Sequence, residues 1–143
     1  MHIDSIETGI VIDHITAGKG MEIYQLLELD KLNCPVAIIM QANSGKMGKK
    51  DIIKISADLD LDKDIDVDAL GYVDPDATIA IIREGKVVEK RELALPETLT
   101  NVIFCKNPRC ITTTEQELPH IFKLADATHK IYRCLYCETK AND

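Results

Sequence analysis

Four cysteines in the last third of the 143-residue chain constrain its fold more than any other feature. Cys105 and Cys110 stand at the ends of CKNPRC, and Cys134 and Cys137 at the ends of CLYC. Each pair can present two thiolates from one short loop, and two such loops can close a tetrahedron around one Zn²⁺. Sulfur would then fill every position, leaving none for water or substrate. We therefore predict one structural zinc site.

Two alternatives to zinc are a reduced set of core cysteines and a redox-active Cys-x-x-Cys pair. Cations beside the cysteines favour the metal, because they can balance the negative charge of a four-thiolate site; they are Lys106, Arg109, Lys130, Arg133 and Lys140. The CLYC pair does not open a helix after a βα unit, as a redox motif would. His120 and His129 could serve as reserve ligands, although four cysteines already satisfy zinc. Cys34, beside Pro35, is predicted to be a small buried hydrophobe.

Composition and charge exclude several classes of protein. The sequence contains no apolar stretch long enough for a membrane span, and its acidic start lacks the apolar core of a signal peptide. We therefore expect a cytoplasmic protein, in which thiols stay reduced and paired cysteines favour zinc over disulfides. The net charge of −7 argues against broad nucleic-acid binding, which needs a basic face.

The order of predicted elements indicates an α+β fold. Strands are expected at 9–18, 35–42 and 51–58, with a helix at 18–30 after the first strand. Met21, Tyr24 and Leu27 mark the apolar stripe of that helix. Asp62 is predicted to cap a second helix that runs to about Leu70, and residues 77–93 to form a hairpin that turns at Glu84-Gly85. This order matches the ferredoxin-like split β-α-β pattern, with two helices on one face of an antiparallel sheet.

The chain is predicted to contain two domains. Residues 93–101 include Pro96 and show little periodicity, so we place the boundary there, between a domain at 1–95 and another at 101–143. The second segment is too small to fold by burial alone and is expected to depend on zinc.

Lysines gather in two segments that a sheet could bring together. Lys46, Lys49, Lys50 and Lys54 surround a predicted glycine loop at 43–50, and Lys86 and Lys90 lie on the later hairpin. In an acidic protein this pattern indicates an anion site, because lysine binds phosphate as a point charge. Solvated lysines on exposed hairpins explain it equally well. Asp13 and His14 lie at the end of the first strand. An Asp-His pair alone is weak evidence for a site, so we interpret these residues as an exposed strand end.

No nucleophile motif, P-loop, dinucleotide fingerprint or open metal site is present in the sequence, which argues against an enzyme.

The chain resembles the regulatory chains of aspartate carbamoyltransferase over nearly its whole length. The resemblance rests on GIVIDHI, SGKMGKKDIIKI, LPETLTNVIFC and the cysteine pairs CKNPRC and CLYC.

The resemblance implies a ferredoxin-like allosteric domain followed by a rubredoxin-like zinc-binding β domain. It implies a non-catalytic subunit that binds CTP and ATP, with UTP assisting CTP in some members, and so modulates pyrimidine biosynthesis. The zinc domain would hold a separate catalytic chain, and regulatory chains would pair through their allosteric domains.

The resemblance also implies roles for individual residues. His14 would lie near the phosphates, Asp13 near the sugar, and Lys50, Lys54 and Lys90 would face phosphate and ribose. Ile3, Asp4, Ser5 and Ile6 would line the base, with Val11 and Val87 as apolar walls. Asn107 and Glu138 would face the catalytic chain.

Three positions depart from the family pattern, and one of them is Arg109, which replaces an uncharged family residue between the first two cysteines. Ala80 and Gly85 stand where well-studied members carry Asn and Tyr, so the predicted phosphate half is intact and the base half is altered. Two hypotheses from other classes follow. One, motivated by Ala80 and Gly85, is a purely structural zinc clamp that does not respond to nucleotides. The other, motivated by the mildly basic segment 105–143, is a zinc-ribbon nucleic-acid binder.

Overall fold

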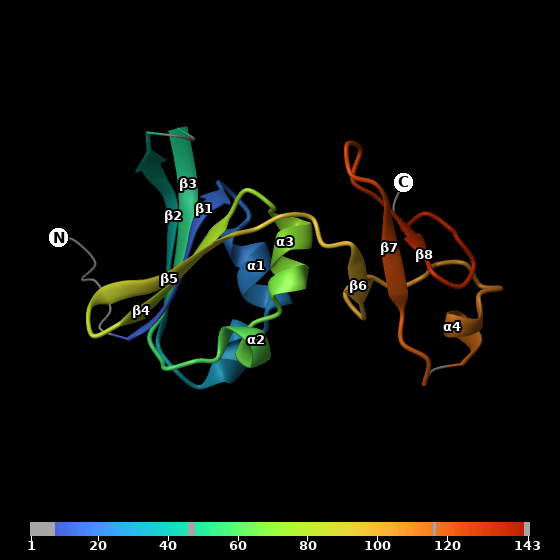
Figure 1. The fold of residues 1–143 in the computed structure, drawn as a ribbon, viewed down its shortest axis with the longest axis horizontal. Helices are drawn as coiled ribbons and strands as arrows, with labels where there is room; N and C mark the ends of the chain where they lie inside the picture. Colours follow the sequence, from blue (N-terminus) through green and yellow to red (C-terminus); the bar gives the residue numbers. More distant parts are fainter. Residues whose placement is uncertain (1–7, 46–47, 116, 142–143) are drawn as a thin grey trace. The chain divides into compact units, whose positions relative to one another are not determined.

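The computed structural model describes residues 8–45, 48–115 and 117–141. The chain divides into two compact units, Met1–Ala94 and Leu95–Asp143 (Figure 1). The described elements of the first unit are, in order, β1 Gly9–Thr16, α1 Gly20–Leu26, the 3-10 helix η1 Leu29–Leu32, β2 Val36–Ser44, β3 Gly48–Ile55, α2 Leu61–Asp64, α3 Val67–Val73, β4 Thr78–Arg83 and β5 Lys86–Glu92. No helix in the described part of the chain is long and apolar enough to cross a membrane.

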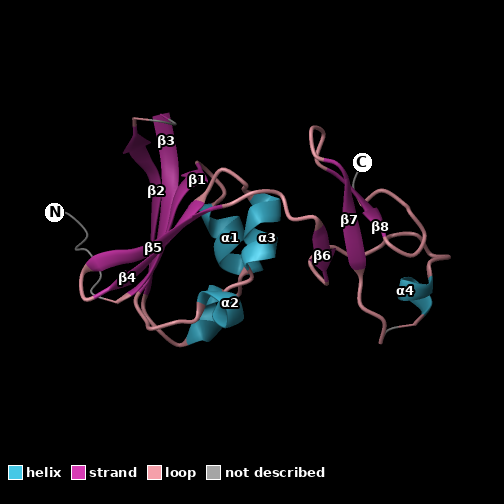
Figure 2. Ribbon diagram, in the orientation of Figure 1, coloured by secondary structure: helices cyan, strands magenta, loops and turns pink. Residues whose placement is uncertain are grey.

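The first unit is an antiparallel sheet in the order β2-β3-β1-β4-β5. The helices α1, α2 and α3 lie on one of its faces, and the other face carries no helix from the described residues (Figures 1 and 2). The first four strands have the order expected of a ferredoxin-like split β-α-β unit, and β5 extends its edge. The predicted α+β class is confirmed.

The core of this unit lies between the sheet and the helices. Ile12, Ile53 and Ile79 lie side by side in the sheet register and have no exposed surface. Their neighbours along each strand point to the opposite face, because side chains alternate along a strand. The β-branched sequence of β1 and β3 therefore builds one buried face and one open face.

The start of α1 is fixed by a buried carboxyl group on β3. Asp51 is fully buried, and its oxygens accept hydrogen bonds from the backbone N–H groups of Gly18, Gly20 and Gln41. A Cβ at Gly20 would lie 2.8 Å from Asp51 Oδ2, so only glycine permits this approach. With Gly20 against the sheet, Ile23 and Leu27 are buried.

This orientation corrects the predicted helix at 18–30. Met21 is 42% exposed and does not belong to the apolar stripe. The α-helix ends at Leu26, because Glu28 adopts the left-handed conformation with φ of 52° before η1 begins. Cys34, which was predicted to be buried, is only partly buried.

The predicted single helix after Asp62 is wrong. Two short helices form instead, and their N-caps are the side chains of Asp60 and Asp66, which accept hydrogen bonds from Asp62 N and Ala69 N. Ile65, between them, is extended and almost fully buried, and this breaks the helix.

The predicted buried strand at 35–42 and the loop at 43–50 also need correction. Among the described strands, β2 lies at the edge of the sheet, pairs with β3 alone and is partly exposed. It continues to Ser44, and β3 begins at Gly48, so Lys49 and Lys50 belong to a strand. The hairpin turn is confirmed: Glu84 and Gly85 have φ values of 53° and 76°, as the tight turn joining two twisted strands requires.

The second unit is built on a three-stranded antiparallel sheet. Its described elements are β6 Thr98–Thr100, α4 Ile111–Thr114, β7 Ile121–Asp126 and β8 Ile131–Cys134, with β7 central. Leu99, Phe122 and Tyr132 form its small apolar centre, and the Tyr132 hydroxyl donates a hydrogen bond to Pro96 O. The expectation of a small β domain with four cysteines is confirmed.

Candidate metal centre and open sheet face

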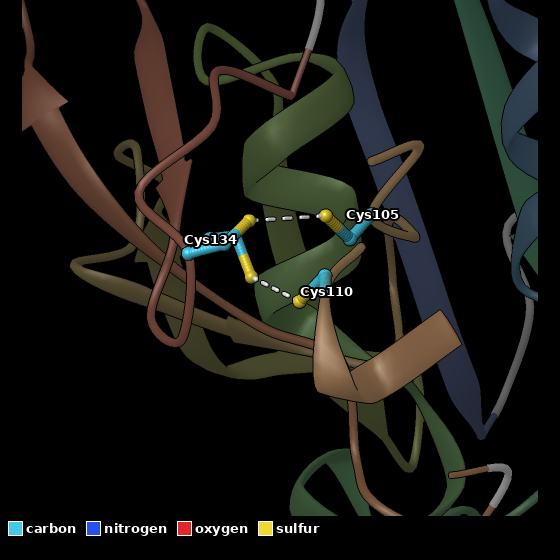
Figure 3. Close-up of side chains that lie close together, drawn as sticks. Cys105, Cys110 and Cys134 are labelled. Carbon is cyan, nitrogen blue, oxygen red and sulfur yellow. Dashed lines mark hydrogen bonds between the residues drawn. The ribbon is translucent and has the colours of Figure 1, made fainter. Parts of the chain in front are cut away.

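The four cysteines come together at one end of the second unit from two short loops, here called knuckles. The first knuckle is 105–110 and the second is 134–137. Cys105 lies in the loop after β6, Cys110 precedes α4, Cys134 ends β8, and Cys137 lies in the turn that follows. Their sulfur atoms all lie within 4.8 Å of one another. Figure 3 shows Cys105, Cys110 and Cys134 pointing toward one another. The geometry therefore unites all four predicted ligands.

The distances fit a zinc ion. Cys105 Sγ lies 3.5 Å from Cys137 Sγ, and Cys110 Sγ lies 3.7 Å from Cys134 Sγ. A regular tetrahedron with Zn–S bonds of about 2.3 Å has edges of about 3.8 Å between its sulfurs. Cys105, Cys110 and Cys134 are buried, so four protein sulfurs with little access for water would enclose the metal.

Each knuckle is a tight turn held by hydrogen bonds between its own residues or with the residue that follows it. In the first knuckle, Asn107 accepts from Cys110 N through its carbonyl and from Arg109 N through Oδ1. In the second, Glu138 N donates to Cys134 O, and Glu138 adopts a φ of 65°. Both predicted partner-facing residues, Asn107 and Glu138, thus lie in the knuckle turns. Asn107 is partly exposed, and Glu138 is exposed.

Two threonines beside the sulfurs were not identified from the sequence. Thr112 Oγ1 lies 3.0 Å from Cys110 Sγ, and Thr139 Oγ1 lies 3.2 Å from Cys137 Sγ. Each threonine follows the second cysteine of its knuckle by two residues, a repeated spacing that could have revealed them. Such hydroxyl groups can stabilise thiolates at a metal site. The five predicted charge-balancing cations are all exposed.

The thiols differ strongly in acidity before metal binds. Burial and neighbouring thiols raise the pKa of Cys105 to about 12. Burial also opposes ionisation of Cys137, but hydrogen bonding with Thr139 and Asn107 lowers its pKa to about 6. One thiolate therefore forms easily, whereas holding four requires a cation at the centre.

The open face of the first sheet carries a row of four residues on four adjacent strands, and three of them are predicted site residues. Lys54 of β3 pairs in register with Val11 of β1, Val11 with Ala80 of β4, and Ala80 with Lys90 of β5. All four residues lie on the face opposite the buried isoleucines. The two lysines therefore stand on either side of an uncharged strip made by Val11 and Ala80.

A polar network lies further along β1 on the same sheet. Lys50 Nζ lies 2.9 Å from Asp13 Oδ1, which also accepts from His14 N at 2.6 Å. His14 Nδ1 lies 3.1 Å from Thr78 Oγ1, and His14 has a φ of 57° where β1 bulges. Asp13 and His14 are partly buried and engaged, so the interpretation as a merely exposed strand end is wrong.

The remaining predicted residues are more dispersed. Val87 pairs with Ile82 and is 59% exposed, and Lys49 donates to Asn43 Oδ1. Lys86 is exposed beside the hairpin turn. Ile3, Asp4, Ser5, Ile6 and Lys46 lie outside the described residues.

The Lys50–Asp13 pair predicts how Asp13 titrates. Burial opposes ionisation of Asp13, but the hydrogen bond and charge of Lys50 and the His14 N–H lower its pKa below 3.8. A lowered pKa adds stability above the unfolded-state pKa of about 3.9, and this is lost as the pH falls through the folded-state value. Carbon-detected NMR should show the Asp13 midpoint rising after Lys50→Met and staying unchanged after Lys49→Met. An equal midpoint in wild type and Lys50→Met would contradict the pairing.

Two family models together match nearly the whole sequence. The family model described as "Aspartate carbamoyltransferase regulatory chain, allosteric domain" matches residues 1–94, and "Aspartate carbamoyltransferase regulatory chain, metal binding domain" matches residues 97–143.

Curated relatives named aspartate carbamoyltransferase regulatory chain are similar over nearly the full length. The protein of Clostridium tetani is 49% identical over 138 residues, covering 95% of this chain and 92% of its own. That of Clostridium botulinum is 48% identical over 136 residues, covering 95% and 90%. That of Bifidobacterium longum is 44% identical over 141 residues, covering 99% of both chains.

Proposed function

The chain belongs to the family of aspartate carbamoyltransferase regulatory chains, and we propose that it binds CTP and ATP on the open face of its first sheet. It is a non-catalytic regulatory chain with an allosteric domain and a metal-binding domain.

The observation that carries the proposal is the row Lys54–Val11–Ala80–Lys90. Neighbouring strands lie about 4.8 Å apart, so the backbones of Lys54 and Lys90 are separated by three spacings, about 14 Å. Long lysine side chains can reach inward from both ends of such a row toward one bound anion. Val11 and Ala80 leave an uncharged strip between them, which suits a sugar or base.

The polar network would complete the site. Lys50 and His14 supply further positive or donor groups for phosphate, and Asp13 can accept hydrogen bonds from ribose hydroxyls. Val87 would form part of the apolar wall. We assign base contacts to Ile3, Asp4, Ser5 and Ile6 on the family resemblance alone. UTP would act together with CTP at this domain.

A second candidate function is favoured by Ala80. This residue lies in the centre of the row, and its methyl side chain has no group that could hydrogen-bond a base. Gly85, in the hairpin turn, likewise has no side chain. If these losses abolish nucleotide recognition, the chain is a zinc-held clamp that joins catalytic chains without responding to CTP or ATP.

We assign four cysteines as ligands of one structural zinc ion: Cys105, Cys110, Cys134 and Cys137. We also propose that the knuckles that carry them contact the catalytic chain. Large apolar side chains next to the cysteines are exposed, and this favours a partner at this end of the domain; they are Phe104, Ile111, Leu135 and Tyr136. Asn107 and Glu138 would add polar contacts at the knuckle turns. Reduced thiols are needed for such a site, which suits a cytoplasmic protein.

We further propose that two copies pair through their allosteric domains at β2. Its sequence, VAIIMQANS, contains no charged residue, although β2 is an edge strand with exposed Met40. Free edge strands usually carry charges or proline that prevent pairing. A second copy of this chain could satisfy that edge.

The lysine variants test the proposed nucleotide site. Lys54→Ala or Lys90→Ala should weaken CTP and ATP binding by about 1–3 kcal/mol, the scale of losing a charged hydrogen-bond partner. The control is Lys86→Ala, which removes an exposed lysine from β5, the strand that also carries Lys90. It should leave the affinity for CTP and ATP unchanged. Calorimetric titration of the zinc-loaded chain measures all three. Wild-type binding that survives both substitutions would refute the site, and no wild-type binding would favour the clamp.

A further inference from the structure

His120, which directly precedes β7, and Ile121, the first residue of β7, contact the two cysteine knuckles. His120 Nδ1 accepts a hydrogen bond from Cys105 N at 3.2 Å, in the first knuckle. Ile121 O accepts from Leu135 N at 2.8 Å, in the second knuckle, between Cys134 and Cys137. The separation of the two cysteine pairs is therefore set in part by protein contacts that do not involve metal.

His120 also closes the long loop that carries the first knuckle. Asn101 N donates to His120 O at 2.7 Å, and His120 N donates to Asn101 Oδ1 at 2.9 Å. These two bonds join the ends of the segment 101–120, which contains Cys105 and Cys110. Within this closed loop, His120 contacts a cysteine through the hydrogen bond that its Nδ1 accepts from Cys105 N.

We propose that His120 is a positioning residue for the metal, holding Cys105 at the distance from the second knuckle that a sulfur tetrahedron requires. The inference rests on the proposed zinc site. Nδ1 can accept only when the ring proton lies on Nε2, so the same nitrogen is not free to serve as a ligand. His120 thus acts through Cys105. Groups that orient metal ligands typically contribute tenfold to hundredfold to metal affinity.

Ring packing is the competing role for His120. Its ring contacts Phe104 edge to face, with centroids 4.8 Å apart and an interplanar angle of 71°. Phe104 is the neighbour of Cys105, so packing alone could also steady the first knuckle. These two roles can be distinguished by one substitution that keeps the hydrogen-bond acceptor and another that keeps the ring.

The experiment compares His120→Asn with His120→Phe in the full-length chain. Asparagine places Oδ1 where Nδ1 lies and keeps the acceptor without the ring, whereas phenylalanine keeps the ring without the acceptor. Competition with a chromogenic chelator gives the zinc dissociation constant. We expect it to rise about tenfold or more in His120→Phe and to stay within about threefold of wild type in His120→Asn. His129→Phe, at an exposed histidine in the β7–β8 hairpin, is the matched control.

A second readout reports the shape of the site. The visible d–d bands of the Co²⁺-loaded chain should shift in His120→Phe and remain in place in His120→Asn. A larger loss of zinc affinity in His120→Asn than in His120→Phe would assign the residue to packing and overturn the proposal, as would equal losses or none. Absence of zinc binding by the wild-type chain would instead overturn the zinc site itself.

Discussion

Replacing Cys110 with serine is expected to unfold the metal-binding domain and abolish association with the catalytic chain, while the allosteric domain stays folded. Cys110 is buried, and its sulfur lies in the four-sulfur cluster. The domain has a small apolar centre of Leu99, Phe122 and Tyr132, whereas structural zinc contributes about 10–16 kcal/mol of binding free energy in small zinc-binding peptides. Loss of one thiolate therefore removes most of what stabilises this unit.

The matched control for Cys110→Ser is Cys34→Ser. Cys34 lies in the other unit and is partly buried, outside the sulfur cluster. Zinc content, circular dichroism and gel filtration with the catalytic chain should all match wild type for Cys34→Ser. Retention of one zinc per chain and of the complex by Cys110→Ser would contradict the assigned ligand set.

Replacing Asp51 with alanine should destabilise the allosteric domain by about 3–5 kcal/mol. The side chain is fully buried and accepts hydrogen bonds from three backbone N–H groups: those of Gly20, the first residue of α1, of Gly18, just before the helix, and of Gln41 in β2. Each buried donor left without a partner costs about 1–3 kcal/mol, although some water entry into the space reduces the sum. The change in the free energy of unfolding can be measured by urea denaturation of the zinc-loaded chain, monitored by the circular-dichroism signal of its helices.

Asp68→Ala is the control for the Asp51 substitution. Asp68 is exposed in the first turn of α3, where the loss of one acid should change stability by less than about 1 kcal/mol. An Asp51→Ala variant as stable as Asp68→Ala would show that this carboxyl group does not hold the start of α1.

The elements that could be predicted from the sequence are those with strong local signals. The alternating β-branched residues of β1 and β3 gave the sheet, Glu84-Gly85 gave the hairpin turn, and the spacing of four cysteines indicated the metal centre. Each of these signals lies within a few residues, so it does not depend on distant contacts.

The features that could not be predicted depend on contacts between segments distant in sequence. The rotation of α1, with Met21 outside and Gly20 against the sheet, is set by Asp51 on β3. The edge position of β2 follows from sheet order and not from its apolar sequence. Likewise, the alignment of Lys54 with Lys90 appears only once β1 and β4 lie between their strands.

The open face and the metal centre have separate roles in this account. The nucleotide would bind the first unit, and the second would hold the catalytic chain, so regulation requires the effector to favour one activity state of the assembly over another. If the proposed site is correct, Ala80 and Gly85 would bear on which nucleotide is preferred.

The most direct test reconstitutes the zinc-loaded chain with its catalytic chain and follows carbamoyl transfer to aspartate while CTP or ATP is added. We predict that at least one nucleotide changes the activity of the complex, that the isolated catalytic chain does not respond, and that a Lys90→Ala complex needs about tenfold or more nucleotide for the same change. A complex that assembles fully but has the same activity at every CTP and ATP concentration would contradict nucleotide regulation and leave the zinc-held clamp.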